Sequence, residues 1–266
     1  MIIDYPGLKY RVRTLLWIGL LCTVACGTDT STKLTIAAAS SMGDAISTLA
    51  DQYGEMADID IQVVLGSSGA LAAQVIQGAP YDVFLSADST HAARVCSHLK
   101  DVNGPMTFAL GSLILVHDEQ LGADLTELLT SSNNGLISVA NPVVAPFGEA
   151  SIDLFQSLGI TDNIQPRLVY GQNALQALQF LVSGSCAMAI TSRGLIHRLD
   201  TTKYKILSID SSLYDPITHV ALPINKKSDA IAFVNYLQSD QATMVLEQYG
   251  YQTKGIQPVR SKTNSQ

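Results

Sequence analysis

Short apolar runs alternate along this chain with amphipathic stretches, and several of the runs end in small or hydroxyl residues. The first run, Leu34–Ala39, has the pattern of a buried strand, and Asp44–Tyr53 carries apolar residues at helical spacing. Ser40 and Ser41 lie between the two. Because the first amides of a helix lack partners and the helix dipole is positive there, this junction suits an anion. A helix cap is the commoner role for such a serine, so this stretch alone favours the cap.

A second strand–serine–helix unit follows directly. Ile59–Leu65 predicts a strand, Gly66–Gly69 contains Ser67 and Ser68, and the residues after it predict a helix. Two consecutive units of this kind predict a right-handed parallel crossover. Ligands of open α/β sheets bind outside the carboxyl ends of the strands. Both serine turns are therefore expected at one edge of one sheet, which strengthens the anion-binding interpretation.

The α/β alternation continues towards the C-terminus. A third strand is predicted within Tyr81–Asp88, with Asp88 capping a helix from Ser89 to Leu99, and Asn141–Gly148 predicts a loop. Further strands are predicted at 136–140, 167–170, 186–191, 204–209 and 218–223, and helices at 149–158, 174–182, 229–237 and 241–249. Long extended stretches near 105–116 and 218–223 predict crossings between two lobes. We therefore expect an α/β fold of two lobes, joined by two crossing strands and able to close about a hinge.

The N-terminal residues predict targeting rather than fold. Lys9, Arg11 and Arg13 precede an apolar run that is too short to span a bilayer, as in a signal peptide. Thr23–Cys26 resembles a lipobox, which predicts lipidation of Cys26 and a periplasmic or cell-surface location. An ordinary signal peptide and an uncleaved anchor are the alternatives. The predicted domains are a signal peptide at 1–25, a lipidated tether at 26–32, one lobe at 33–110 and 220–258, a second lobe at 111–219, and a flexible tail at 259–266.

The net charge limits the classes of binding partner, and the cysteines limit the possible disulfides. The whole chain has 266 residues and a net charge of −7, and removal of the positively charged 1–25 segment leaves the mature chain more negative. This argues against nucleic acid and against an anionic membrane face as partners, apart from the N-terminal lipid. We expect a monomer. Cys96 and Cys186 could form a disulfide in an oxidising compartment or remain two buried thiols, and the sequence leaves both open.

No enzyme signature accounts for the serine turns. Gly66–Gly69 does not fit the Gly-x-Ser-x-Gly spacing of a nucleophile elbow. The histidines are scattered, and we expect each at the surface: His91, His98, His117, His197 and His219. The sequence also shows no zinc-protease motif, paired Cys-x-x-Cys, Walker loop or dinucleotide fingerprint. Arg193 could add positive charge at the mouth of the site, although a solvated arginine is the commoner case.

Five motifs between Lys33 and Tyr251 form a combination typical of one family: Ala37–Ser40, Gly66–Leu71, Gly78–Asp88, Asn141–Gly148 and Tyr249–Tyr251. Together they resemble the periplasmic molybdate-binding proteins of ABC importers, and the resemblance covers Lys33 to Tyr251. It implies a periplasmic-binding-protein-like fold of the second type, with the oxyanion between the lobes. It also implies that hydroxyls and backbone amides hold the anion, without a cofactor, a metal cation or a basic residue.

Carried over by motif, the resemblance implies five ligand residues: Ser40, Ser68, Phe147, Ala174 and Ser192. The family has a tyrosine at the fifth position and a small residue where Phe147 stands. Ser192 keeps a hydroxyl but loses reach, so the loop comes closer, a water bridges, or the contact is absent. The acidic residues of these motifs, Asp44 and Asp88, are interpreted as helix-start residues and not as acceptors for a protonated anion.

The resulting hypothesis is an extracytoplasmic solute-binding protein that captures molybdate, together with tungstate, and delivers it to an ABC permease. A receptor for another tetrahedral oxyanion, such as sulfate, is the alternative within this class. A serine-dependent enzyme and a surface adhesion module are the alternatives from other classes. A fluorophosphonate probe would label only a nucleophilic serine, and an adhesion module would show no anion-dependent thermal stability.

Overall fold

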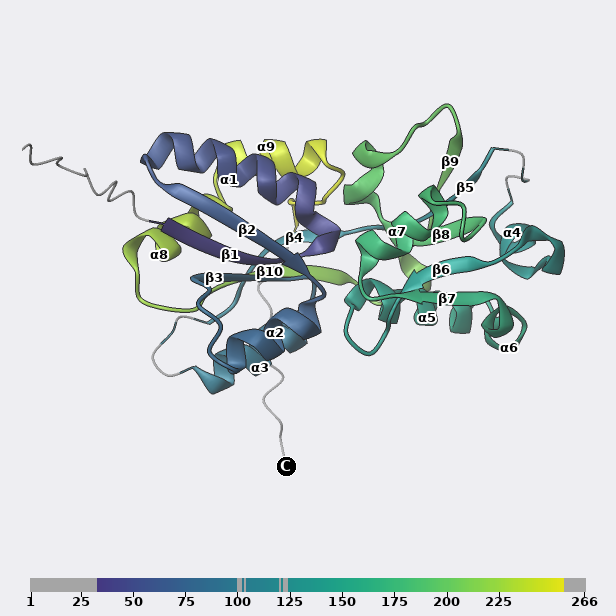
Figure 1. Ribbon diagram of the computed structural model, residues 1–266, viewed down its shortest axis with the longest axis horizontal. Coiled ribbons are helices and arrows are strands. Elements are labelled where there is room, and N and C mark those ends of the chain that lie inside the picture. The colour runs from purple at the N-terminus through teal and green to yellow at the C-terminus, as the bar shows by residue number, and fades with distance from the viewer. Residues whose placement is uncertain (1–32, 100–101, 103, 120, 122–123, 256–266) are drawn as a thin grey trace, which may run out of the picture. The chain divides into compact units, whose positions relative to one another are not determined.

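The computed structural model describes residues 33–99, 102, 104–119, 121 and 124–255. The predicted signal peptide, the lipidation of Cys26, the tether up to residue 32 and the tail at 259–266 lie outside the described residues. The described residues form one compact unit that contains two five-stranded sheets (Figure 1). Among the described residues, no helix has the length and apolar character needed to cross a membrane.

The first sheet has the strand order β2-β1-β3-β10-β4. Its strands are β1 (Lys33–Ala39), β2 (Asp60–Gly66), β3 (Val83–Ser86), β4 (Met106–Gly111) and β10 (Ile217–Pro223). β1 pairs in parallel with β2 and β3, so the predicted parallel crossover is confirmed, whereas β10 runs antiparallel to both of its neighbours. The carboxyl ends of β1, β2 and β3 therefore open onto one edge, where both serine turns lie.

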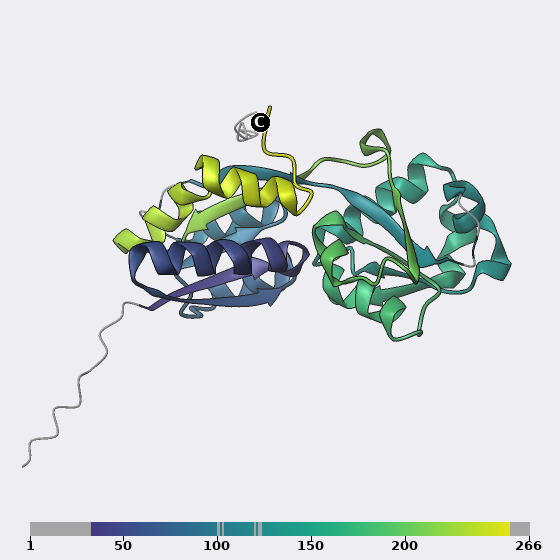
Figure 2. The same ribbon diagram turned by 90° about the horizontal axis from the view of Figure 1, so that it is seen from above.

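Helices cover both faces of the first sheet. They are α1 (Gly43–Ala57), α2 (Ser68–Ile76), α3 (Ser89–His98), α8 (Ser228–Tyr236) and α9 (Asp240–Gln248). Leu71 and Val75 of α2 pack with Phe84 on one face, and Ile46 of α1 packs in the larger core on the other. Figure 2 shows α9 (yellow) running beside α1 (purple), in agreement with their contacts. Each of these helices buries one apolar stripe, as its periodicity predicts.

The second sheet has the order β7-β6-β8-β5-β9. Its strands are β5 (Leu113–Asp118), β6 (Ile137–Ala140), β7 (Leu168–Gly171), β8 (Met188–Ser192) and β9 (Tyr204–Ser208). The associated helices are α4 (Leu125–Thr130), α5 (Pro146–Ser157), α6 (Thr161–Ile164) and α7 (Ala174–Val182). β6 is parallel to β7 and β8, so the carboxyl ends of β6 and β7 also share an edge. Five short 3-10 helices complete the described elements: η1 (Ser40–Met42), η2 (Ser132–Asn134), η3 (Gln165–Arg167), η4 (Arg193–Arg198) and η5 (Ser211–Leu213).

The chain passes between the two sheets twice. β4 ends at Gly111 and β5 begins at Leu113, so the long extended stretch is two strands of different sheets separated by Ser112. The return runs through 209–216, between β9 and β10. The second crossing was predicted at 218–223, which was wrong, because β10 pairs with β3 and β4 and lies wholly within the first sheet. The predicted α/β fold of two lobes is confirmed.

Two further features differ from the sequence-based expectations. α5 begins at Pro146, three residues before its predicted start, because proline suits the first turn of a helix. His117 and His219 are buried within β5 and β10, so the expectation that every histidine lies at the surface was wrong. The apolar neighbours of these two strands bury them despite the polar ring. Cys96 and Cys186 are both free thiols, which resolves the alternative in favour of no disulfide.

Candidate functional site

Turns from both sheets meet around one small cavity, which we call the cage. Its lining consists of the residues that follow parallel strands and begin helices: Ala39, Ser40, Ser41, Gly66, Ser67, Ser68, Ala87, Ala145, Pro146, Phe147, Asn173 and Ala174. These residues follow β1, β2 and β3 in the first sheet and β6 and β7 in the second. The cage thus lies outside the carboxyl ends of strands from both lobes, where α/β folds bind ligands.

The first serine turn brings two unsatisfied hydroxyls into the cage. Ser40 and Ser41 are each 3% exposed, and neither side-chain oxygen has a hydrogen-bond partner among the described residues. η1 has no side-chain cap, so neither serine serves as the N-cap that was the commoner interpretation. A buried polar group without a partner costs about 1–3 kcal/mol, which indicates that a ligand completes these hydroxyls.

In the second serine turn, capping and ligand binding are divided between two neighbours. Ser67 caps α2, since its hydroxyl accepts a hydrogen bond from the Ala70 amide at 3.4 Å. Ser68 accepts a hydrogen bond from the Ala87 amide at 3.0 Å. Because that bond uses the oxygen of Ser68 as an acceptor, its proton remains available for donation to a ligand.

The second lobe contributes backbone amides at two helix N-termini. Pro146 starts α5 and has no N–H, so Phe147 carries the first amide donor of that helix. Ala174 is the first residue of α7, and the side chain of Asn173 caps the helix by accepting from the Gln176 amide at 3.0 Å. First-turn amides have no intrahelical acceptor and lie at the positive end of the helix dipole. Both amides are therefore suited to an anion.

The two lobes also contact each other directly beside the cage. The Gly69 amide of α2 donates to the Val144 carbonyl of the second lobe at 2.9 Å. A Cβ at position 69 would lie 3.1 Å from the Val144 Cα and 2.9 Å from His91 Nε2. Glycine at this position permits the close approach of the second serine turn to the opposite lobe.

Four of the five predicted site residues, Ser40, Ser68, Phe147 and Ala174, line the cage. Ser192 is fully buried at the end of β8, but it is not among the lining residues. Its hydroxyl accepts from the Gly194 amide at 3.2 Å and interacts with the hydroxyl of Tyr251. Ser41 and Ser67 also line the cage, although the five predicted ligand residues do not include them; of the two, Ser41 has the unpartnered hydroxyl. The pair of adjacent hydroxyls in Ser40-Ser41 was the available signal.

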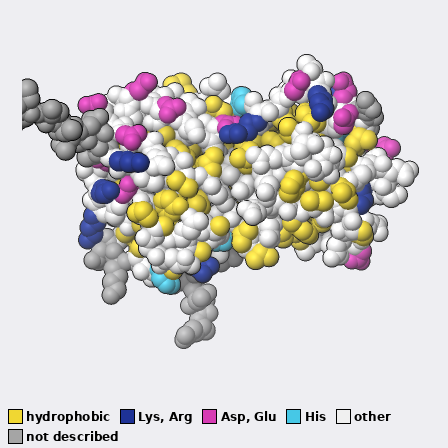
Figure 3. Space-filling model, viewed as in Figure 1, with side chains coloured by type: hydrophobic (Ala, Val, Ile, Leu, Met, Phe, Trp, Pro, Cys, Tyr) yellow, Lys and Arg dark blue, Asp and Glu magenta, His cyan; other side chains and the backbone are white. Residues whose placement is uncertain are grey.

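Charged side chains are kept out of the cage lining. Asp44, in the first turn of α1, forms an ion pair with Arg198. Asp88 caps α3 by accepting from the His91 amide at 2.6 Å, and its other oxygen lies 2.7 Å from His91 Nδ1. Both acidic residues therefore act at helix starts, as predicted. Figure 3 shows acidic side chains mainly along the margins of one face and hydrophobic ones in its middle.

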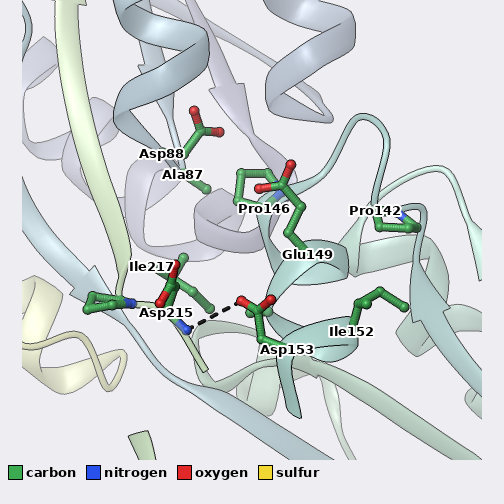
Figure 4. A pocket seen from close by; sticks show the side chains of 11 residues that line it. Ala87, Asp88, Pro142, Pro146, Glu149, Ile152, Asp153, Asp215 and Ile217 are labelled. Carbon is green, nitrogen blue, oxygen red and sulfur yellow. Dashed lines mark hydrogen bonds between the residues drawn. The ribbon is translucent and has the colours of Figure 1, made fainter. Parts of the chain in front are cut away.

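A second, larger cavity lies next to the cage and has the opposite character. It has a volume of about 420 Å³ and shares Ala87 and Pro146 with the cage. Four carboxylates line it, as Figure 4 shows: Asp88, Glu149, Asp153 and Asp215. Burial and the negative charge of Asp88 raise the pKa of Glu149, and the hydrogen bond to Asp88 raises the pKa of His91. We call this the acidic cavity. No group of three His, Cys, Asp or Glu side chains in the described part of the chain could hold a metal ion.

The comparison with protein families decides the class. A family model described as "Bacterial extracellular solute-binding protein" matches residues 34–252. The chain belongs to this family. It is accordingly a binding protein of the extracytoplasmic space and not an enzyme, as the sequence predicted.

Several named proteins and solved structures are similar to this chain. The chain is 28% identical over 247 residues to "Molybdate-binding protein ModA" of Azotobacter vinelandii, covering 91% of this chain and 96% of that protein. It is 25% identical to the protein of the same name in Escherichia coli (strain K12), covering 84% and 90%. The solved periplasmic molybdate-binding protein of Azotobacter vinelandii superposes with a TM-score of 0.75 at 24% identity, covering 82% of this chain and 98% of that chain. The sulfate-binding protein SubI from Mycobacterium tuberculosis H37Rv superposes with a TM-score of 0.67 at 15% identity, covering 84% and 88%.

Proposed function

We propose that this chain captures molybdate, and tungstate with it, and delivers the anion to an ABC permease. The observation that carries the proposal is the pair of buried, unpartnered hydroxyls of Ser40 and Ser41 in a cage whose lining contains no charged side chain. Its donor set consists of the hydroxyls of Ser40, Ser41 and Ser68 and the amides of Phe147 and Ala174. Ser41 takes the place that the motif comparison assigned to Ser192.

The absence of carboxylates from the cage lining sets the class of anion. A tetrahedral dianion without protons can accept a hydrogen bond at every oxygen, and bonds to charged acceptors are stronger than neutral ones. A protonated phosphate would need an acceptor, and no carboxylate lines the cage. The cage therefore favours fully deprotonated oxyanions over phosphate at neutral pH.

The names of similar proteins and the origin of the donors in both lobes support the transport role. The names of the two ModA relatives favour molybdate, and their matches span nearly all of this chain. Donors come from both lobes, so only the closed arrangement supplies all of them to the anion, which couples binding to closure. The predicted lobe boundaries at 110–111 and 219–220 move to Ser112 and to 209–216, because β4 ends at Gly111 and β10 begins at Ile217. The monomeric state and the lipid anchor at Cys26 belong to the same proposal.

Sulfate is the second candidate. It is also a tetrahedral dianion, and the fold matches a protein named for sulfate binding. The bulky side chain of Phe147 does not decide between the two anions, because the residue contributes its amide. Molybdate and tungstate are larger than sulfate, so relative affinity reports the fit of the cage.

The test is calorimetric titration of residues 27–266 with molybdate, tungstate, sulfate and phosphate in turn. Tight binding of molybdate and tungstate without heat from sulfate or phosphate would support the proposal. Sulfate binding as tight as molybdate binding would establish the second candidate. The absence of heat from all four anions would contradict the receptor role. Labelling by a fluorophosphonate probe would instead support the alternative of a nucleophilic serine.

A further inference from the structure

The hydroxyl of Tyr251 lies where three chain segments meet beside the cage. Gly250 ends α9 with a φ of 83°, and the Tyr251 amide then donates to the Leu246 carbonyl at 3.0 Å. Gln252 pairs with Leu110 through two backbone hydrogen bonds of 2.8 and 3.0 Å. Because backbone contacts fix the residues on both sides, the ring of Tyr251 has a defined direction. It is 4% exposed.

This hydroxyl joins the first serine turn to the second lobe. It donates to the Ser41 carbonyl at 2.7 Å. Burial raises the pKa of Tyr251, and a hydrogen bond from the Ser192 side chain partly offsets that rise. A Cβ at position 194 would lie 1.9 Å from the Tyr251 oxygen and 2.9 Å from the Ser41 carbonyl oxygen. Glycine at position 194 therefore leaves the space that the tyrosine hydroxyl occupies.

The donors and acceptors define one direction for the chain of hydrogen bonds. The single proton of the Tyr251 hydroxyl points at the Ser41 carbonyl, so any hydrogen bond between Tyr251 and Ser192 is donated by the Ser192 hydroxyl. Ser192 in turn accepts from the Gly194 amide at 3.2 Å. Both hydroxyls thus lie against Gly194: Ser192 accepts from its amide, and Tyr251 fills the space beside its Cα. From there Tyr251 reaches the backbone of Ser41, whose own hydroxyl lines the cage.

We propose that Tyr251 and Ser192 are a pair of positioning residues that orient the Ser40–Ser41 turn for the anion without touching it. This rests on the proposed function. Ligand groups must be held within about 0.5 Å of their productive positions by such supporting contacts. The pair links the first lobe to the end of β8 in the second lobe, so it assists the anion only when the two lobes adopt this arrangement.

The ring environment makes Tyr251→Phe a clean test. The ring of Tyr251 lies edge-on against His219 at 5.2 Å between centroids, so it stays packed when the hydroxyl is removed. We expect Tyr251→Phe to raise the Kd for molybdate about five- to tenfold, since one buried hydrogen bond to the turn is lost. Calorimetric stoichiometry should remain that of the wild type, because a variant that merely misfolds lowers the number of sites instead.

Ser192→Ala and the double variant separate positioning from direct ligand contact. If the two hydroxyls act as one unit, Ser192→Ala weakens binding and the double variant binds no more weakly than the worse single variant. Tyr236→Phe is the matched control, because its hydroxyl bonds Gln52 at 3.4 Å away from the cage. It should change the unfolding midpoint only.

Two results would overturn the inference: an unchanged Kd for Tyr251→Phe, or effects of Tyr251→Phe and Ser192→Ala that multiply fully in the double variant. The second result would mean that Ser192 contributes to binding independently of Tyr251. The wild-type titration in the same series distinguishes this failure from that of the proposed function, since a wild type that binds no anion removes both.

Discussion

The cage and the acidic cavity lie side by side, share Ala87 and Pro146, and differ completely in charge. The cage is lined by small residues, hydroxyls and helix N-termini, whereas four carboxylates line the acidic cavity. An acidic protein can thus offer an anion site if its carboxylates are excluded from the lining itself. The difference teaches that local donors, rather than the net charge of the chain, decide what the cleft binds.

Distance and water explain why the two regions can coexist. In a buried site with a low effective dielectric, one unit charge a few ångströms from an anion changes its energy by several kcal/mol. Across a wide cavity that holds water and salt, the same charge is strongly screened. Figure 4 shows Asp88 and Glu149 on one side of the acidic cavity and Asp153 with Asp215 on the other. Where solvent fills the space between these carboxylates and an anion in the cage, screening reduces their repulsion.

Placing a carboxylate inside the cage, as in the acidic cavity, should have the largest effect on molybdate affinity. Ser40→Asp replaces a buried donor with a negative charge beside the anion, and we expect at least about a thousandfold loss of molybdate affinity. Calorimetric titration measures it. Ser132→Asp adds the same charge at an exposed position of η2 and should leave the Kd within about twofold of the wild type. Binding that survived in Ser40→Asp would mean that the anion lies elsewhere.

Removing one hydrogen-bond donor from the cage should have the second largest effect on molybdate affinity. Ser68→Ala should lower molybdate affinity about tenfold to a hundredfold, because one buried, charge-assisted hydrogen bond is lost. Ser67→Ala is a close control, since this neighbour caps α2 through the Ala70 amide. We expect it to cost about 1 kcal/mol of folding stability and to leave the Kd nearly unchanged. The reverse pattern would assign the ligand role to Ser67.

Much of this site was predictable because it is local. The strand–serine–helix pattern placed Ser40 and Ser68 on one sheet edge through hydrophobic periodicity within short windows. The exclusion of Asp44 and Asp88 from the cage followed from their positions at helix starts. Phe147 needed the family resemblance, because α5 begins at a proline inside a predicted loop.

The remaining part of the site depends on contacts between distant segments. Tyr251 meets Ser41 across 210 positions of the sequence, and periodicity carries no information on such a contact. The position of Ser192 relative to the cage likewise depends on how β8 packs against the other lobe. His219 was expected at the surface because histidine is usually partly exposed, yet tertiary packing buried it against Phe147 and Tyr251.

His219, which packs against the cage residue Phe147, makes folding stability depend on pH. Burial lowers the pKa of His219 to about 4, below its ordinary value of 6.5. The unfolded chain therefore binds this proton more tightly, so folding stability is lost as the pH falls from 6.5 through 4. His219→Leu should remove this loss, which amounts to about 2 kcal/mol between pH 7.5 and pH 5.

Urea denaturation at the two pH values measures the difference between His219→Leu and the wild type. His98→Leu is the control, because His98 lies exposed in the last turn of α3. An equal pH dependence for His219→Leu and the wild type would show that His219 is accessible to protons in the folded protein. The surroundings of His219 would then be open to protons, as those of the acidic cavity are.

The smallest expected effect comes from the acidic cavity itself. Glu149→Gln removes one of its four carboxylates and should speed molybdate association about twofold at low salt, since long-range repulsion is reduced. At high salt the rates of variant and wild type should converge, because screening removes the difference. Stopped-flow kinetics at two ionic strengths measure both. Glu127→Gln makes the same change in the first turn of α4, away from the cleft, and should leave the rate unaltered. A tenfold gain for Glu149→Gln would instead place this carboxylate in direct contact with the anion and merge the two cavities into one site.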